Sequence, residues 1–108
     1  DYETRKNFRY SETPIPISEI TRRINELIQP ENMKKLSYKS LLDWLIQAGF
    51  LALITREDGK TTRTPTDTGQ QLGITSEQRQ GRNGTYTVVV YNKAAQQFIL
   101  DNLDATIE

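Results

Sequence analysis

Apolar residues recur at helical spacing in the first half of the chain, after a stretch that has no clear period. We interpret residues 1–13 as a linker or a loosely attached arm whose aromatic rings can dock on the core. Ser18 stands where a helix N-cap is expected. The apolar residues that follow it are Ile20, Ile24, Leu27 and Ile28. They predict a helix that Pro30 ends near Gln29, because proline cannot continue a helix.

Two more helices are predicted next. The first is short and covers residues 31–36, and Ser37 is placed to cap a longer one from Tyr38 to Ala48. The longer helix has a broad apolar stripe made of Leu41, Leu42, Trp44, Leu45 and Ala48. Gly49 is a natural stop, since glycine readily adopts the left-handed conformation that ends many helices.

A β-hairpin follows these helices. The apolar run 50–54 predicts a strand, Asp58-Gly59 predicts the turn, and the mostly β-branched segment 61–64 predicts the return strand. Helix, short helix, helix and hairpin is the order of elements in a winged helix-turn-helix.

Turn signals are frequent after the hairpin. A short helix is predicted over 68–72, and Gly73 ends it. Thr75 or Ser76 can cap a further single turn, and residues 81–84 have the composition of a loop.

The end of the chain returns to a regular pattern. Residues 85–91 are all β-branched or aromatic and form the strongest predicted strand, followed by an amphipathic helix over 93–103. The apolar side of that helix carries Ala94, Phe98, Ile99 and Leu103. We expect Val88 and Val90 to pair with the strand over 50–54, which gives a three-stranded sheet.

We therefore predict one α+β domain over residues 14–108, with a winged helix-turn-helix-like core and an additional C-terminal strand and helix. A chain of 108 residues suffices for one hydrophobic core and is too short for two. The alternative is an α+β domain whose helices and hairpin do not make a true helix-turn-helix.

The composition excludes several classes of function. The chain has no Cys and no His, so it lacks thiolate chemistry, the commonest general base and the commonest transition-metal ligand. We find no catalytic residues, no metal ligands and no cofactor motif, and we expect that the chain is not an enzyme. No apolar run reaches the roughly 20 residues of a membrane span, and no signal peptide is evident, so a cytoplasmic location without membrane contact is expected.

Charge is balanced overall but uneven along the chain. The 14 basic and 14 acidic residues cancel, yet residues 60–93 hold five basic and two acidic residues. The candidate nucleic-acid contacts are Lys39, Ser40, Gln47, Lys60, Arg63, Arg79 and Arg82. Arg79 and Arg82 flank a Gly-rich loop that also holds Gln78, Gln80 and Asn83, where guanidinium groups are able to contact phosphates. Tyr86 and Tyr91 have rings that can stack on bases.

The other candidates lie on the longer helix and the hairpin. Lys39, Asp43 and Gln47 share one helical face, and Ser40 lies near its N-terminal end. Lys60 and Arg63 follow the hairpin turn, which also carries two acidic residues. An ordinary solvated surface explains each of these segments about as well as a binding role does.

Three stretches together resemble a known kind of domain. They are Met33–Ser37 leading into Asp43-Trp44-Leu45, Pro65–Ile74, and Tyr86–Tyr91 running into Ala95–Ile99. They are similar to a small domain appended to bacterial helicase-like and nuclease-like DNA-processing proteins, and the middle stretch also resembles phage antirepressor C-terminal regions. The resemblance implies a non-catalytic accessory domain that binds DNA, with the rest of a larger parent protein as a second partner. The alternative is a protein-interaction or regulatory module.

Overall fold

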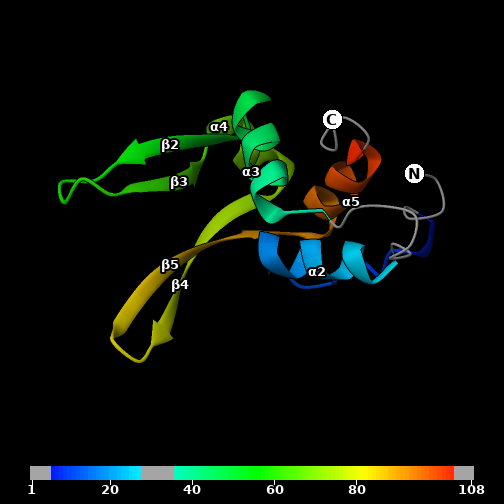
Figure 1. Ribbon diagram of the computed structural model, residues 1–108, viewed down its shortest axis with the longest axis horizontal. Helices are drawn as coiled ribbons and strands as arrows, with labels where there is room; N and C mark the ends of the chain where they lie inside the picture. The colour runs from blue at the N-terminus through cyan, green and yellow to red at the C-terminus, as the bar shows by residue number, and fades with distance from the viewer. Residues whose placement is uncertain (1–5, 28–35, 104–108) are drawn as a thin grey trace.

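Four helices and two antiparallel sheets make up residues 6–27 and 36–103, the part of the chain that the computed structural model describes (Figure 1). The domain is therefore α+β. Its elements in chain order are β1 (Ile15–Pro16), α2 (Ile17–Leu27), α3 (Tyr38–Gln47), β2 (Leu51–Thr55), β3 (Thr61–Pro65), α4 (Asp67–Leu72), β4 (Ile74–Gly81), β5 (Gly84–Tyr91) and α5 (Lys93–Asp101).

β5 is the central strand of the larger sheet, whose order is β1-β5-β4. Tyr91 lies opposite Ile15 of β1 and opposite Ile74 of β4, and all three side chains are buried. Beyond this inner end, β4 and β5 continue as a long hairpin that projects from the body of the domain (Figure 1).

The expected pairing of Val88 and Val90 with the strand over 50–54 is wrong. Val88 lies opposite Glu77, and Val90 lies between Thr75 and Pro16. β5 pairs with β4 because the two are joined by a tight turn, and a local hairpin closes at a smaller entropic cost than a distant pairing does. β2 and β3 form a separate two-stranded sheet.

β4 also replaces the single helical turn that Thr75 or Ser76 was expected to cap. The side chains from Ser76 to Gln80 point alternately to the two faces of the strand, and both faces are polar. Four of these five side chains are exposed. A strand with water on both faces shows no apolar alternation, so its sequence has the composition of a loop. The predicted loop at residues 81–84 shrinks to a turn at Arg82 and Asn83.

Capping side chains set the starts of three helices. Ser37, Thr66 and Asn92 each accept a hydrogen bond from a backbone N–H in the first turn of α3, α4 and α5. Ser37 is confirmed as a cap, whereas Ser18 is wrong because α2 already begins at Ile17. Gln29, Pro30 and residues 31–35 of the predicted short helix lie outside the described residues.

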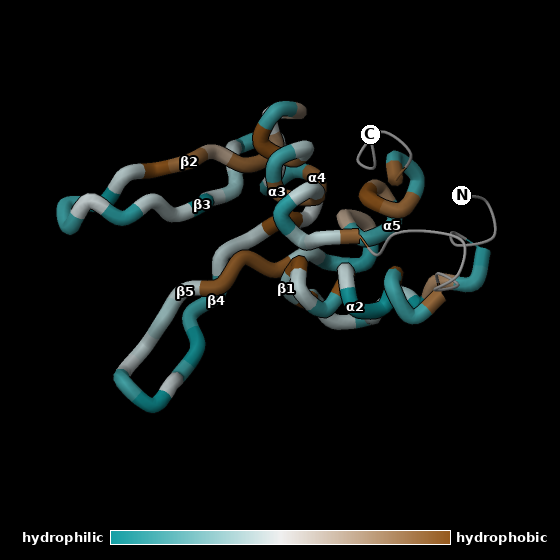
Figure 2. Tube along the Cα trace, viewed as in Figure 1, coloured by the Kyte–Doolittle hydropathy of each residue, from teal (hydrophilic) through white to brown (hydrophobic). Residues whose placement is uncertain are grey.

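The core joins apolar residues of α2, α3 and α5 with Phe8 of the N-terminal segment, and Leu72 of α4 packs against it. Figure 2 shows hydrophobic stretches along α3 and α5. The expected apolar stripes are partly wrong, because Ala48 and Ala94 are exposed. Trp44 is half-buried and lies against the rings of Phe50 and Phe98, with centroids 6.5 and 5.8 Å away.

A buried glutamine links the N-terminal segment to this core. Gln96 is fully buried in α5; its Oε1 accepts from the Ser11 backbone N–H at 2.7 Å, and its Nε2 donates to the backbone oxygens of Ser11 and Tyr91. These bonds pair both the oxygen and the nitrogen of the side-chain amide. The burial of Gln96 therefore favours the one position of the N-terminal segment in which these bonds form.

Gly73 follows α4 and packs against Asn92, the residue that caps α5. We predict that Gly73→Ala destabilises the fold strongly. Its φ is +117°, and a Cβ there would lie 2.1 Å from Oδ1 of Asn92, the atom that caps α5. Gly59→Ala is the matched control, since φ is +84° but the space around it is open. We expect about 1–2 kcal/mol for Gly59→Ala and clearly more for Gly73→Ala in urea unfolding. Equal losses would contradict the role of Gly73 in placing Asn92.

Truncation of Trp44 should also destabilise the domain, because its ring packs on two other aromatic rings. We expect Trp44→Ala to lower the free energy of unfolding by about 2–3 kcal/mol, somewhat below the value for a fully buried aromatic. Tyr38→Ala removes a ring that is 55% exposed and should change the free energy of unfolding by less than about 0.5 kcal/mol. A Trp44 variant as stable as the Tyr38 variant would show that the three-ring cluster contributes nothing.

Candidate nucleic-acid interface

The two hairpins leave the body of the domain on the same side and diverge (Figure 1). Residues of both hairpins line a cleft between them. The cleft has a volume of about 260 Å³. Its walls come from β2 and β3 on one side and from β5 on the other, and the start of α2 lies at its edge. The lining residues are Pro16, Ile17, Ser18, Leu42, Leu51, Thr62, Arg63, Thr87, Val88, Val89 and Tyr91.

Strand register places some of the lining side chains on shared faces, while Thr62 and Val88 line the cleft from the other faces of their strands. Alternate residues along a strand share a face, so Leu53 and its cross-strand partner Arg63 lie on the same face as the buried Leu51. On β5, Thr87 and Val89 share the face of Tyr91 in the same way. Apolar and hydroxyl side chains therefore line the same cleft as Arg63.

Two polar atoms in the cleft are buried and have no hydrogen-bond partner among the described residues: Nε of Arg63 and the phenolic oxygen of Tyr91. Tyr91 is fully buried, and this burial raises the pKa of its phenol, while the charge of Arg63 lowers it by a smaller amount. The phenol is therefore neutral and keeps its O–H as a donor. Unpaired buried donors are costly in a folded protein, so these two mark the cleft as a candidate site.

Of the site residues predicted on α3, Lys39 fits an interface best. It is exposed in the first turn. Ser40 is half-buried, and its hydroxyl lies 3.0 Å from that of Ser37, so it is engaged in the helix cap. Gln47 is exposed but lies in the last turn, about 12 Å along the helix from Lys39. The structure therefore does not bring Gln47 together with Lys39.

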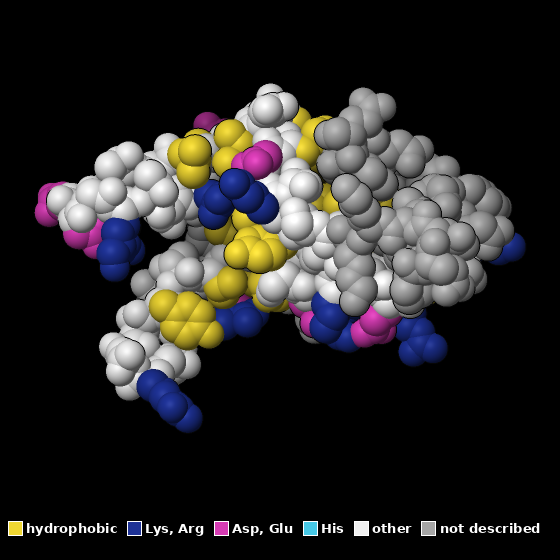
Figure 3. Space-filling model, viewed as in Figure 1, with side chains coloured by type: hydrophobic (Ala, Val, Ile, Leu, Met, Phe, Trp, Pro, Cys, Tyr) yellow, Lys and Arg dark blue, Asp and Glu magenta, His cyan; other side chains and the backbone are white. Residues whose placement is uncertain are grey.

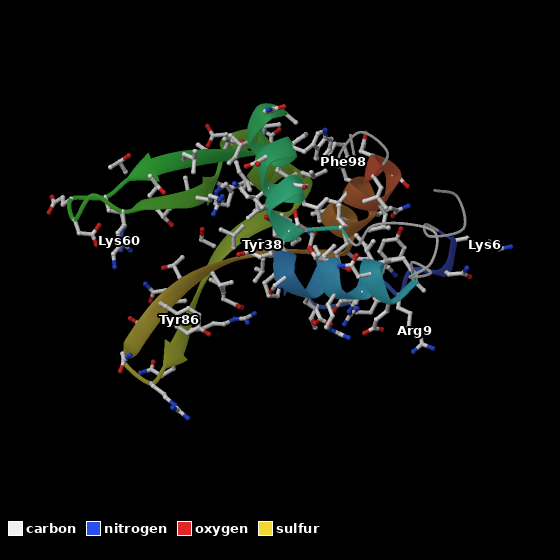
Figure 4. The ribbon with its side chains drawn as sticks, in the orientation of Figure 1. Lys6, Arg9, Tyr38, Lys60, Tyr86 and Phe98 are labelled. Carbon is white, nitrogen blue, oxygen red and sulfur yellow. The ribbon has the colours of Figure 1, made fainter. Side chains whose placement is uncertain are left out.

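The β2–β3 hairpin carries its charges at the tip and on one wall. Lys60 is exposed directly after the turn, and in Figure 4 its side chain extends toward the side of the β4–β5 hairpin. The acidic character of the tip is partly neutralised, because Arg56 binds the Asp58 carboxylate at 2.9 Å. The Asp58 carboxylate also accepts the Lys60 backbone N–H, and this bond is the main cause of its lowered pKa.

The β4–β5 hairpin holds the other two predicted arginines, and neither flanks a Gly-rich loop as expected. Arg79 lies within β4, and its Nε donates to the Glu77 carboxylate at 2.8 Å. Arg82 is exposed in the turn at the tip. Because Arg79 already has an anionic partner, Arg82 is the better phosphate contact of the two.

Exposed aromatic rings accompany the basic residues. Tyr86 lies opposite Arg79 on β5 and is 51% exposed, and Tyr38 is exposed at the start of α3. Figure 4 shows both rings near the opening between the hairpins. Figure 3 shows Lys and Arg side chains at both hairpin tips and over α3, with hydrophobic side chains between them. Sequence reasoning missed Tyr38, although its position off the apolar stripe of α3 was a usable signal.

A second hollow, of about 460 Å³, lies beside α2, and two of the three arginines that line it, Arg22 and Arg23, are paired with carboxylates. Arg22 and Arg23 both bind the Glu19 carboxylate, and Arg22 also binds Glu26. Hydrogen bonds from Arg22 and then Arg23 lower the pKa of Glu19 to about 2, so the carboxylate stays ionised and neutralises this surface. The cleft between the hairpins is therefore the stronger candidate.

Comparison with protein-family models, with curated proteins and with solved structures finds no match to this chain. Within the described residues, no group of three or more Asp or Glu side chains is placed to hold a metal ion. None of the helices in that part of the chain is long and apolar enough to span a membrane.

The unpaired phenol of Tyr91 generates a prediction about stability. A buried tyrosine hydroxyl that has a hydrogen-bond partner typically contributes about 1 kcal/mol, but here its removal costs no bond within the described residues. We therefore expect Tyr91→Phe to leave the free energy of unfolding unchanged or to raise it by up to about 1 kcal/mol. Equilibrium unfolding in urea measures this change, and a clear loss of stability would mean that the hydroxyl is bonded inside the folded protein.

Proposed function

We propose that this chain is a non-catalytic accessory domain that binds nucleic acid, mainly through phosphates, as part of a larger helicase-like DNA-processing protein. The observation that carries the proposal is the pair of diverging hairpins on either side of one cleft, which both carry cations, with the exposed rings of Tyr38 and Tyr86 beside them. Lys60 and Arg63 come from one hairpin, and Arg79 and Arg82 come from the other. Cations that track a backbone, together with rings on which bases stack, are the elements of nucleic-acid binding.

The order of elements supports a winged-helix arrangement for this binding. α2 and α3 precede the β2–β3 hairpin, as the two helices of a helix-turn-helix precede a wing. In that arrangement the first turn of α3, with Lys39 and Tyr38, approaches the nucleic acid next to the wing.

The β4–β5 hairpin supplies a second binding element. A two-stranded ribbon fits the major groove of DNA, and an isolated two-stranded ribbon adds little stability to a fold. From Gln78 to Thr87 its side chains are mostly exposed, and they are rich in amides and hydroxyls. Such groups hydrogen-bond to phosphates and base edges alike, so an exposed ribbon of this composition suits contact with a polyanion.

Docking on a protein partner is the competing function, and one observation favours it. Leu53 and Ile54 on β2 are 56% and 46% exposed, on opposite faces of the hairpin. Apolar side chains at an exposed strand commonly mark protein contacts. This function predicts no binding to nucleic acid at low salt, which separates it from the proposal.

Salt dependence of DNA binding tests the proposal. Each phosphate that is neutralised adds about 0.9 to the magnitude of the slope of log K against log salt for duplex DNA. We expect Lys60→Ala/Arg82→Ala to weaken binding of duplexes of any sequence and to lower this magnitude by up to about 1.8. Fluorescence anisotropy of labelled duplex and single-stranded DNA at several salt concentrations measures both quantities.

The matched control removes the same charge elsewhere. Lys6 and Arg9 lie at the end of the molecule away from the hairpins (Figure 4), so Lys6→Ala/Arg9→Ala should leave the slope unchanged. If both double variants lower the slope equally, the binding is a general attraction between charges that does not depend on the hairpin tips. Absence of binding by the wild-type chain at low salt would overturn the proposed function.

A further inference from the structure

The base of the cleft gathers hydrogen-bond donors from three elements that are distant in sequence. Tyr91 is at the inner end of β5, Arg63 is on β3, and the first residues of α2 are at the edge of the same cleft. The phenol of Tyr91 is fully buried and unpaired among the described residues, and so is Nε of Arg63. These groups converge on one volume of about 260 Å³.

All of these groups donate, and the cleft offers no ionised acceptor to satisfy them. A neutral phenol can donate its O–H, a guanidinium has only donors, and the first N–H groups of a helix have no partner inside the helix. No Asp or Glu is among the described residues that line the cleft. The site therefore suits a ligand that carries several acceptor atoms and a negative charge.

The start of α2 adds the positive end of a helix dipole, and the ionised Glu19 in its first turn is paired with Arg22 and Arg23 and does not line the cleft. α2 has 11 residues, and the aligned peptide dipoles of a helix place about half a positive charge at its N-terminus. Ser37, Thr66 and Asn92 cap the other three helices, whereas at the start of α2 the structure describes no capping side chain. Helix N-termini with free N–H groups bind phosphate groups in many proteins.

The surroundings strengthen the attraction for an anion. Leu42 and Leu51 are buried beside the donors, and Val89 is half-buried. Apolar walls lower the local dielectric constant, so a charge interaction in this place is less screened than one at a hairpin tip. The hydroxyls of Thr62 and Thr87 stand at the exposed rim as further hydrogen-bonding groups.

We propose that the base of the cleft is a binding site for a phosphate group, held by Arg63, by the Tyr91 hydroxyl and by the start of α2. A tetrahedral phosphate presents oxygens in several directions, which suits donors that approach from two strands and a helix. The phosphate comes either from a nucleic-acid backbone or from a free phosphate-bearing ligand, and the backbone source alone rests on the proposed function.

Inorganic phosphate is the first probe. We expect sodium phosphate to raise the midpoint of thermal unfolding of the full chain above its value in sodium chloride of equal ionic strength, because a ligand that binds only the folded state stabilises it. Phosphate also stabilises proteins in general by exclusion from their surface. The specific effect is therefore the part that Tyr91→Phe and Arg63→Gln lose.

Two further variants separate directional bonds from charge. Arg63→Lys keeps the charge but loses the Nε donor, and we expect it to lose most of the phosphate-dependent shift. Arg82→Gln removes a charge from the exposed hairpin tip and should keep the full shift. Equal phosphate-dependent shifts in the wild-type chain, Tyr91→Phe and Arg63→Gln would overturn the site.

A DNA-binding measurement on the same variants identifies the source of the phosphate. If the site holds a backbone phosphate, Tyr91→Phe and Arg63→Gln weaken oligonucleotide binding several-fold, and inorganic phosphate competes with the oligonucleotide more than chloride does. If both variants bind DNA as the wild type does but lose the phosphate shift, the ligand is a free phosphate compound. A phosphate-dependent shift without any DNA binding upholds the phosphate site and overturns the proposed function. DNA binding without a phosphate-specific shift upholds the proposed function and overturns the phosphate site.

Discussion

The pairing of Tyr91 with Ile15 on one side and Ile74 on the other holds the domain together. This row crosses the β1-β5-β4 sheet at its inner end, and the Tyr91 backbone oxygen also accepts from the buried amide of Gln96. One residue thereby joins the start of α2, the base of the long hairpin and α5. The positions of the cleft walls follow from this row, because the long hairpin diverges from the point that it fixes.

Where local chemistry decides the structure, the sequence was sufficient. Ser37 and Gly49 mark the ends of α3, Asp58-Gly59 marks the first hairpin turn, and Gly73 ends α4 with a left-handed backbone. Each of these signals acts within a few residues, so no knowledge of the tertiary structure is needed to interpret it. The α+β class and the pairing of β2 with β3 followed from them, whereas the partners of β5 did not.

β4 shows why the remainder could not be predicted. Its side chains from Thr75 to Gln80 are polar on both faces, and a strand is recognised in sequence mainly by alternation of apolar and polar residues. The same omission affected the candidate site, because Arg79 was placed beside a loop and not in a strand, and Tyr91 was considered only as a stacking ring. The unpaired phenol and the position of Arg63 beside it arise from the packing of two hairpins, which no local pattern encodes.

The hydrogen bonds between Ser11 and Gln96 connect residues that are 85 positions apart, and this distance has a consequence for folding kinetics. Helices and hairpins form from neighbouring residues in microseconds, whereas contacts between the two ends of a chain must first overcome a large loss of loop entropy. We therefore expect the first strand and the segment before it to join the domain late, after β4, β5 and α5. In this order of events, the side-chain amide of Gln96 stays exposed to water until the N-terminal segment docks and buries it.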